Sequence, residues 1–333
     1  MTTVTQTDDT IVPRLEAAAE RVQRAHKAAA GVIFGQDVVI ERTLITLLSG
    51  GHALLIGVPG LAKTLLVETL GRVLGLDAKR IQFTPDLMPS DIIGAEVLED
   101  TPGQSRRSFR FIKGPIFTQL LMADEINRAS PKTQSALLQA MQEHHVTVAG
   151  QRHDTPAPFH VLATQNPLEQ EGTYPLPEAQ LDRFLLQVDV SYPDLVAERR
   201  MLYSTTGTEE RKLEAVLNAG ELMSIQRLVR QIPVPDKVVE AILKLVRSAR
   251  PGTGASEDTD RYVAWGPGPR ASQALMLAVR AKALIDGRLA PSIDDVVALA
   301  DPILKHRMAL TFAARAEGQD LGQIISRLAA AVE

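Results

Sequence analysis

The stretch GVPGLAKT, residues 57–64, combines glycines, a lysine and a hydroxyl in the order used by phosphate-binding loops. The usual pattern has glycine directly before the lysine, but here alanine stands at that position, as Ala62. Alanine removes no backbone N–H, so the donors that bind phosphate remain. If the position needs left-handed backbone, alanine costs roughly 1–2 kcal/mol more than glycine, which the binding of a triphosphate tolerates. The alternative is a glycine-rich turn with a chance lysine.

A working loop of this kind gives its residues defined tasks. Lys63 is expected to reach the β- and γ-phosphates, and the Thr64 hydroxyl is expected to bind Mg²⁺. We therefore predict that a nucleoside triphosphate binds here together with Mg²⁺. The predicted nucleotide-binding residues of this loop are Gly57, Val58, Pro59, Gly60, Leu61, Ala62, Lys63, Thr64 and Leu65.

Two adjacent carboxylates, Asp124 and Glu125, stand at the end of the apolar run QLLMAD. Ligands of open α/β sheets bind at the carboxyl ends of the strands. At that edge Asp124 would hold Mg²⁺ or its waters, and Glu125 would polarise the attacking water. Acidic residues also favour the start of a helix, so the pair alone is ambiguous. Together with the phosphate-binding loop, it predicts nucleotide hydrolysis.

Three further polar residues could complete a hydrolytic site. Asn166 ends the run FHVLATQN and could touch the γ-phosphate or the attacking water, although asparagine before proline also favours a turn. Arg183 in LDRF could stabilise charge on a transferring phosphoryl group, or form a surface ion pair with Asp182 or Glu178. Arg270 opens a helix in GPGPRAS, where a cation is unfavourable for the helix dipole. Bound phosphate is therefore a good candidate partner for Arg270.

An alternation of strands and helices carries these residues. Five short apolar runs are expected to be strands covered on both faces, as in a parallel α/β sheet. A helix is expected at 63–74, directly after the phosphate-binding loop, and Ser130 with Pro131 predicts another helix N-terminus. The predicted strands lie at 52–57, 80–84, 119–124, 159–166 and 184–190.

Two segments interrupt this alternation, at 95–114 and 144–155, and both have the pattern of hairpin insertions. After Pro193 the pattern is helical, with a loop at 251–269. We therefore predict an α/β nucleotide-binding domain at 11–205, built on a five-stranded parallel sheet. An all-helical lid domain at 206–333 follows it, and a disordered N-terminus at 1–10 precedes it.

Composition limits the classes of function. The 333 residues include no cysteine, which excludes disulfides and iron–sulfur clusters. The net charge of −4 argues against nucleic-acid binding through a strongly basic surface. The N-terminus lacks the order of a signal peptide, and no apolar run has the length of a membrane helix. A soluble cytoplasmic protein is expected.

These elements in this order resemble those of the AAA+ ATPases, and the amino-acid sequences of the motifs are similar to those of the MoxR family within the AAA+ ATPases. The resemblance covers roughly residues 30–310, and alanine before the loop lysine is common in MoxR proteins. No Gly-x-Gly-x-x-Gly follows a strand, which disfavours dinucleotide binding. The motifs that carry the resemblance are GVPGLAKT, DLMPSDIIG, DEINRA, ATQNP, YPLPEAQLDRF and GPGPRA.

The resemblance implies a role for each candidate residue. Residues 57–64 would be the Walker A loop and Asp124 with Glu125 the Walker B pair. Gly35 and Gln36 would lie near the adenine, and Arg128 is a rival for contact between subunits. The remaining implied roles are the first sensor for Asn166, the arginine finger offered to a neighbouring subunit for Arg183, and the second sensor for Arg270.

The resemblance also implies an ATP-hydrolysing homo-oligomeric ring, expected to be a hexamer, with the two hairpins lining or facing the ring. Such a ring would remodel or mature protein partners, often ones that carry a von Willebrand factor A domain. One alternative is a nucleic-acid-acting AAA+ motor, which the net acidity disfavours. Another is a non-hydrolysing nucleotide switch or scaffold, against which Glu125 and Arg183 argue.

Overall fold

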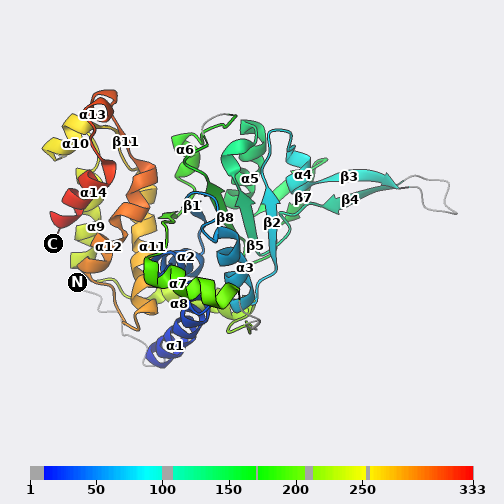
Figure 1. Ribbon diagram of the computed structural model, residues 1–333, viewed down its shortest axis with the longest axis horizontal. Helices are drawn as coiled ribbons and strands as arrows, with labels where there is room; N and C mark the ends of the chain where they lie inside the picture. The colour runs from blue at the N-terminus through cyan, green and yellow to red at the C-terminus, as the bar shows by residue number, and fades with distance from the viewer. Residues whose placement is uncertain (1–10, 100–107, 170–171, 207–212, 253–255, 333) are drawn as a thin grey trace, which may run out of the picture.

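The structure is a computed structural model that describes residues 11–99, 108–169, 172–206, 213–252 and 256–332. The predicted N-terminal segment 1–10 and the turn of the first predicted hairpin lie outside these ranges. Within them, the elements divide into an α/β part and a helical part that lie side by side, with one two-stranded ribbon extending from the α/β part (Figure 1).

All five predicted apolar runs form one parallel sheet, with strand order β2-β5-β8-β1-β9. The three central strands are almost fully buried because helices cover both faces, which is why they are uninterrupted apolar runs. Their carboxyl ends share one edge, so the segments after β1, β5 and β8 lie together there. The strands are β1 (Ala53–Ile56), β2 (Ala78–Gln82), β5 (Leu120–Asp124), β8 (His160–Gln165) and β9 (Leu186–Asp189).

Alternate residues of each strand serve opposite faces of the sheet. In β1, Ala53 and Leu55 join one apolar cluster, whereas Leu54 joins the other. Helix α5 (Pro131–Glu143) covers the second face, and it begins as predicted, with Ser130 as N-cap and Pro131 in the first turn. Helices α2 (Asp37–Leu48) and α3 (Lys63–Val73) cover the first face.

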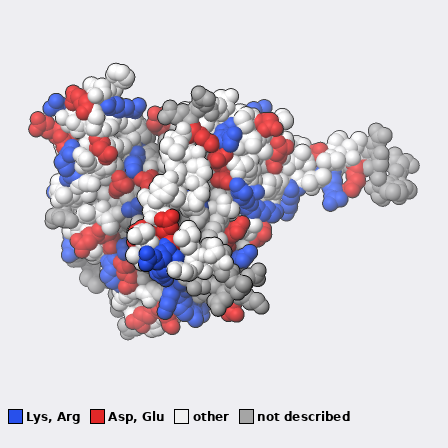
Figure 2. Space-filling view, viewed as in Figure 1, with Lys and Arg blue, Asp and Glu red and all other residues white. Residues whose placement is uncertain are grey.

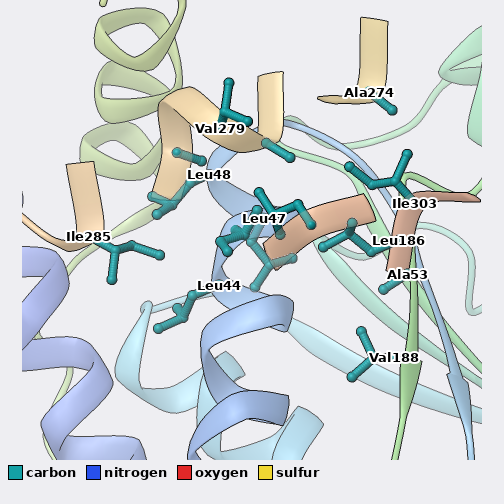
Figure 3. Close-up of a cluster of buried hydrophobic side chains, with 14 of the residues drawn as sticks. Leu44, Leu47, Leu48, Ala53, Leu186, Val188, Ala274, Val279, Ile285 and Ile303 are labelled. Atoms are coloured by element: carbon teal, nitrogen blue, oxygen red, sulfur yellow. The ribbon is translucent and has the colours of Figure 1, made fainter. Parts of the chain in front are cut away.

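The apolar cluster beneath α2 continues into the helical part of the molecule. Leu47 of α2 lies beside Leu186 of β9 and Ile303 of α12 (Figure 3). Val279 of α11 belongs to the same cluster. The helical part is therefore joined to the sheet by a continuous core, in addition to the chain connection.

Both predicted hairpins are present. The first pairs β3 (Gly94–Glu99) with β4 (Ser108–Lys113) and forms the ribbon that extends from the body in Figure 1. The second pairs β6 (His145–Val148) with β7 (Gln151–Asp154). The ring of Phe111 in β4 stacks on His153 in β7, with 3.9 Å between the ring centroids, so the two insertions contact each other.

The segment predicted as a loop at 251–269 contains structure that periodicity did not reveal. A short helix, α10 (Glu257–Tyr262), begins where the Ser256 side chain accepts from the Thr259 backbone N–H. Strand β10 (Val263–Trp265) then pairs with β11 (Ala309–Leu310), which adds a small ladder to the helical part. Acidic residues in the first turn of α10 were the local signal for a helix start.

Other helices complete the two parts, and none of the helices in the described ranges combines the length and apolarity needed to cross a membrane. In the α/β part they are α1 (Ile11–Ala30), α4 (Pro89–Ile93), the 3₁₀ turn η1 (Ile126–Arg128), α6 (Glu178–Leu181) and α7 (Leu195–Thr205). Those that follow are α8 (Ala219–Gln231), α9 (Asp236–Ser248), α11 (Pro269–Ile285), α12 (Ile293–Leu304), the 3₁₀ turn η2 (Lys305–Arg307), α13 (Phe312–Ala316) and α14 (Leu321–Ala330).

Candidate nucleotide-binding site

The loop between β1 and α3 has the backbone of an anion-binding turn. Gly60 has a φ of 83° and Ala62 has a φ of 57°, so the alanine does occupy left-handed backbone. Helix α3 starts at the next residue, which places its free N–H groups at the loop. A Cβ at Gly57 would lie 2.7 Å from the carbonyl oxygen of Val190, so glycine is required there by close approach of the backbone.

Lys63 is folded back onto its own loop. Its ammonium donates to the carbonyl oxygens of Gly57, at 2.7 Å, and Val58, at 2.8 Å. Burial lowers the pKa of Lys63, while the charges of Asp124 and Glu125 oppose that shift. The lysine is thus a positioned cation between the loop and the two carboxylates.

A cavity of about 510 Å³ lies over the loop and the carboxyl edge of the sheet. It brings together most of the residues that the sequence singled out, from three separate motifs. It also includes Arg80, Gln82 and Thr164, which sequence reasoning missed. The lining residues are Pro59, Gly60, Leu61, Ala62, Lys63, Thr64, Leu65, Arg80, Gln82, Asp124, Glu125, Thr164 and Asn166.

Asp124 is buried at the end of β5, with 8 % of its surface exposed, and it is held by two neighbouring strands. The Thr164 hydroxyl on β8 donates to Asp124 Oδ1 at 2.5 Å and accepts from the Glu125 N–H at 2.9 Å. On the other side, Arg80 of β2 donates to Asp124 Oδ2 through both Nε, at 3.1 Å, and Nη2, at 2.5 Å.

Glu125 also has left-handed backbone, with a φ of 55°, which turns its side chain into the cavity. Its Oε2 accepts from Gln82 Nε2 at 2.6 Å and from Arg128 Nη1 at 3.0 Å. Gln82 and Arg128 therefore fix the orientation of this carboxylate.

Thr64 and Asp124 fit the requirements of a Mg²⁺ site. The hydroxyl and the carboxylate line the same cavity, and both offer the oxygen ligands that Mg²⁺ prefers. Magnesium keeps several waters and takes few protein ligands when it binds with phosphates. The described residues hold no cluster of three or more metal-binding side chains, and a site of this kind does not need one.

A second cavity, of about 270 Å³, adjoins the first and shares the loop residues from Pro59 to Ala62 and Leu65. Gln36 lines it and donates to the Ser191 carbonyl oxygen at 2.6 Å. Its other walls are mainly apolar, which suits a flat heterocycle such as adenine. The lining residues that sequence reasoning missed are Val32, Ile33, Phe34, Tyr192, Pro193, Glu198 and Met201.

Gly35, predicted near the adenine, does not line this second cavity. It has a φ of 69°, and a Cβ at this position would lie 2.5 Å from Ala197 Cβ in α7. Glycine is needed at this position because α7 packs closely against the turn before α2. Glycine here lets α7 approach the cavity that Gln36 lines.

The three remaining candidates differ in position. Asn166 lines the first cavity, and its Oδ1 also accepts from the Leu168 N–H at 3.1 Å, which is the turn-forming interaction. Arg183 lines neither cavity. Arg270 lines neither cavity and lies 3.8 Å from Asp182, in a pair whose arginine side chain is half exposed.

Comparison with known proteins identifies the family to which the chain belongs. Residues 52–186 match the model of the ATPase family associated with various cellular activities (AAA), and residues 255–328 match the AAA lid domain. The chain is 42% identical to "Chaperone MoxR1" of Mycobacterium tuberculosis over 94% of its length and 82% of that protein. The chain belongs to the MoxR family of AAA+ ATPases.

Other MoxR-type relatives and a solved structure agree. "Protein MoxR" of Paracoccus denitrificans is 31% identical, with 87% of this chain and 89% of that protein covered. The crystal structure of a candidate ATPase from Cytophaga hutchinsonii superposes with a TM-score of 0.87 at 36% identity, covering 95% of this chain and 96% of that one. The match to the AAA model contains the loop, Asp124, Glu125, Asn166 and Arg183, and the lid match contains Arg270.

Proposed function

We propose that this MoxR-family protein binds ATP with Mg²⁺ and hydrolyses it. The observation that carries the proposal is the single cavity that Lys63 and Thr64 share with Asp124 and Glu125. Phosphoryl transfer depends mainly on positioning and charge, and this cavity has a positioned cation, oxygen ligands and a carboxylate. Thr64 and Asp124 would hold Mg²⁺, whose charge offsets that of the phosphates.

The residues of the cavity have separate tasks in this proposal. The backbone N–H groups of the loop and Lys63 bind the phosphates, and the neighbouring apolar cavity beside Gln36 takes the adenine. Glu125 polarises the attacking water, and Asn166 orients that water or the γ-phosphate. Arg270, on the helical part, reaches the nucleotide after leaving Asp182.

We further propose that the active form is a homo-oligomeric ring, a hexamer, that remodels or matures protein partners, including ones with a von Willebrand factor A domain. The position of Arg183 outside its own cavity supports a role in the site of a neighbouring subunit. Arg128 is engaged by Glu125 of its own subunit, which favours Arg183 for the contact between subunits. Acidic and basic side chains are mixed over the face seen in Figure 2, which is not the strongly basic surface that a nucleic-acid-acting motor would favour.

Two variants test the nucleotide site, with Lys79→Ala as a charge-matched control outside the cavity. Lys63→Ala should abolish the binding of fluorescent ATP, because the loop loses its phosphate-reaching cation. Glu125→Gln should bind ATP like the wild type and release phosphate about 100-fold more slowly or worse, because an amide cannot act as a base. Unchanged ATP affinity in Lys63→Ala, or turnover near the wild-type rate in Glu125→Gln, would contradict the proposal.

A further inference from the structure

Arg80 binds one oxygen, Oδ2, of the carboxylate that would hold the metal. Two of its nitrogens donate to Asp124 Oδ2, while Asp124 Oδ1 is taken by Thr164. Both Asp124 oxygens are therefore engaged by protein donors. The pair is unequal, because 51% of the Arg80 side chain is exposed and only 12% of the Asp124 side chain is.

The edge strand β2 aims Arg80 at this site by its register. Arg80 and Gln82 are two residues apart, so their side chains point to the same face of the strand, whereas Ile81 points into the core. Cα pairing sets Arg80 opposite Met122 and Gln82 opposite Asp124, so the guanidinium reaches along the strand to the carboxylate. Arg80 Nη2 also donates to Gln82 Oε1 at 2.7 Å, which steadies it in that direction.

A buried carboxylate needs a compensating positive charge. Lys63 does not contact Asp124, since its ammonium donates to the carbonyl oxygens of Gly57 and Val58. Arg80 is the cation that contacts Asp124 directly, at Oδ2, and both residues line the cavity. Because half of its side chain is exposed, the guanidinium can turn toward solvent without loss of core packing.

We propose that Arg80 is a stand-in cation that neutralises Asp124 when no metal is bound and must leave Oδ2 when metal and nucleotide enter. Arg80 thereby lowers the affinity for the metal, and this inference rests on the proposed function of the cavity. Asp124 then binds one cation at a time, either the guanidinium or the metal ion.

Metal binding tests the inference without using catalysis. Mn²⁺, whose electron paramagnetic resonance signal reports the free ion, is titrated into protein saturated with ADP. Arg80→Gln should bind Mn²⁺ about tenfold more tightly than the wild type, because the competing charge is gone. Arg80→Lys keeps a cation and should stay within a few-fold of the wild type. Lys79→Gln is the matched control, because it removes the same charge from the adjacent residue, whose ammonium donates to the Phe117 carbonyl oxygen.

Thermal unfolding in EDTA without nucleotide provides a second arm that needs no ligand. There Arg80→Gln should lower the unfolding midpoint by about 2–4 °C, because Asp124 loses its partner. Adding Asp124→Asn should recover most of that loss, because the uncompensated charge is removed.

The outcomes separate the inference from the proposed function. Equal or weaker Mn²⁺ binding by Arg80→Gln, or an equal gain in Lys79→Gln, overturns the inference and leaves nucleotide binding intact. A wild type that binds neither ADP nor Mn²⁺ overturns the proposed function instead. In that case the EDTA arm still decides, because equal midpoints in Arg80→Gln and the wild type would show that Arg80 does not compensate Asp124.

Discussion

The guanidinium of Arg307 donates to the carboxylate of Asp182, with 2.7 Å between Nε and Oδ1, across 125 residues of chain. Asp182 directly precedes Arg183. Arg307 also donates to the carbonyl oxygens of Asp182, at 3.3 Å, Phe184, at 2.6 Å, and Leu185, at 3.2 Å, so it binds the backbone on both sides of Arg183. The helical part of the molecule therefore fixes the segment from which Arg183 projects.

Replacing Arg307 should destabilise the fold strongly. Arg307 is 2 % exposed, and Arg307→Met would leave Asp182 and several carbonyl groups without their buried donor. A loss of about 3–5 kcal/mol in the free energy of unfolding is expected, measured by chemical denaturation. The control is Arg261→Met, which removes an exposed arginine 3.9 Å from Glu317 and should cost less than about 1 kcal/mol. Similar losses in the two variants would show that the buried contacts of Arg307 contribute little.

Mixing two inactive variants should restore activity if Arg183 acts on a neighbouring subunit. Arg183→Ala keeps its own nucleotide site and offers no arginine, whereas Lys63→Ala offers the arginine and binds no nucleotide. Mixed rings contain some sites with both parts, so phosphate release should exceed that of either variant alone. An arginine finger contributes about 10³–10⁵ in rate, which makes partial rescue measurable.

Labelled subunits should first confirm that mixed rings form in this experiment. Mixed rings without any return of activity would show that Arg183 has a structural or same-subunit role. Arg128 would then be the leading residue for the contact between subunits, and the same mixing test applies to Arg128→Ala.

Ala62→Gly should stabilise the protein and leave ATP affinity unchanged. The φ of 57° strains an alanine and not a glycine, although glycine adds entropy to the unfolded chain. A net gain of about 0.5–1 kcal/mol is expected from unfolding curves. Ala149→Gly, at a φ of 48° in the turn of the second hairpin, is the matched control. If Ala62→Gly weakens ATP binding and Ala149→Gly does not, the methyl group itself takes part in binding.

Two buried histidines should make stability depend on pH. Burial lowers the pKa of His160 to about 4. Burial and the charge of His160 together lower the pKa of His52 to about 3. His52 Nδ1 accepts from the Val161 N–H at 2.9 Å, which holds this ring neutral. His160 lies between the Gly51 carbonyl oxygen, at 2.8 Å, and Gln226 Nε2, at 3.1 Å, so its second nitrogen is the acceptor.

The unfolded chain therefore binds protons at a higher pH than the folded one. Stability contributed by the neutral histidines is complete above pH 6.5 and is lost as the pH falls from 6.5 toward 4 for His160 and toward 3 for His52. His160 alone accounts for about 3 kcal/mol over that window. His160→Gln should flatten the curve of unfolding free energy against pH. Parallel curves for the wild type and His160→Gln would contradict the assignment.

The strands could be predicted because parallel, doubly covered strands are uninterrupted apolar runs. Strand β2 is the exception, because it begins at Ala78, two residues before the predicted start at 80. Only Ile81 of β2 is buried, because β2 lies at the edge of the sheet, so the first part of the strand has no apolar signal.

The site was predictable where one motif supplies both the residue and its position, as at Lys63 and Asp124. Arg80 and Thr164 were not predicted as site residues because they contact Asp124 from neighbouring strands. No local sequence pattern reveals the strand order β2-β5-β8. The pair of Arg270 with Asp182 also joins distant parts of the chain, and no local pattern predicted it.

The ribbon of β3 and β4 leaves the body of the protein at Gly94 and Gly114, where added Cβ atoms would collide with the backbone of Ile112 and Ile92. With six residues in each strand, the ribbon is about 20 Å long. A rotation of about 10° at this base would move the far end of the ribbon by about 3–4 Å. Leu98 and Phe109, whose apolar side chains are exposed, lie in the outer half of the ribbon and would be displaced most.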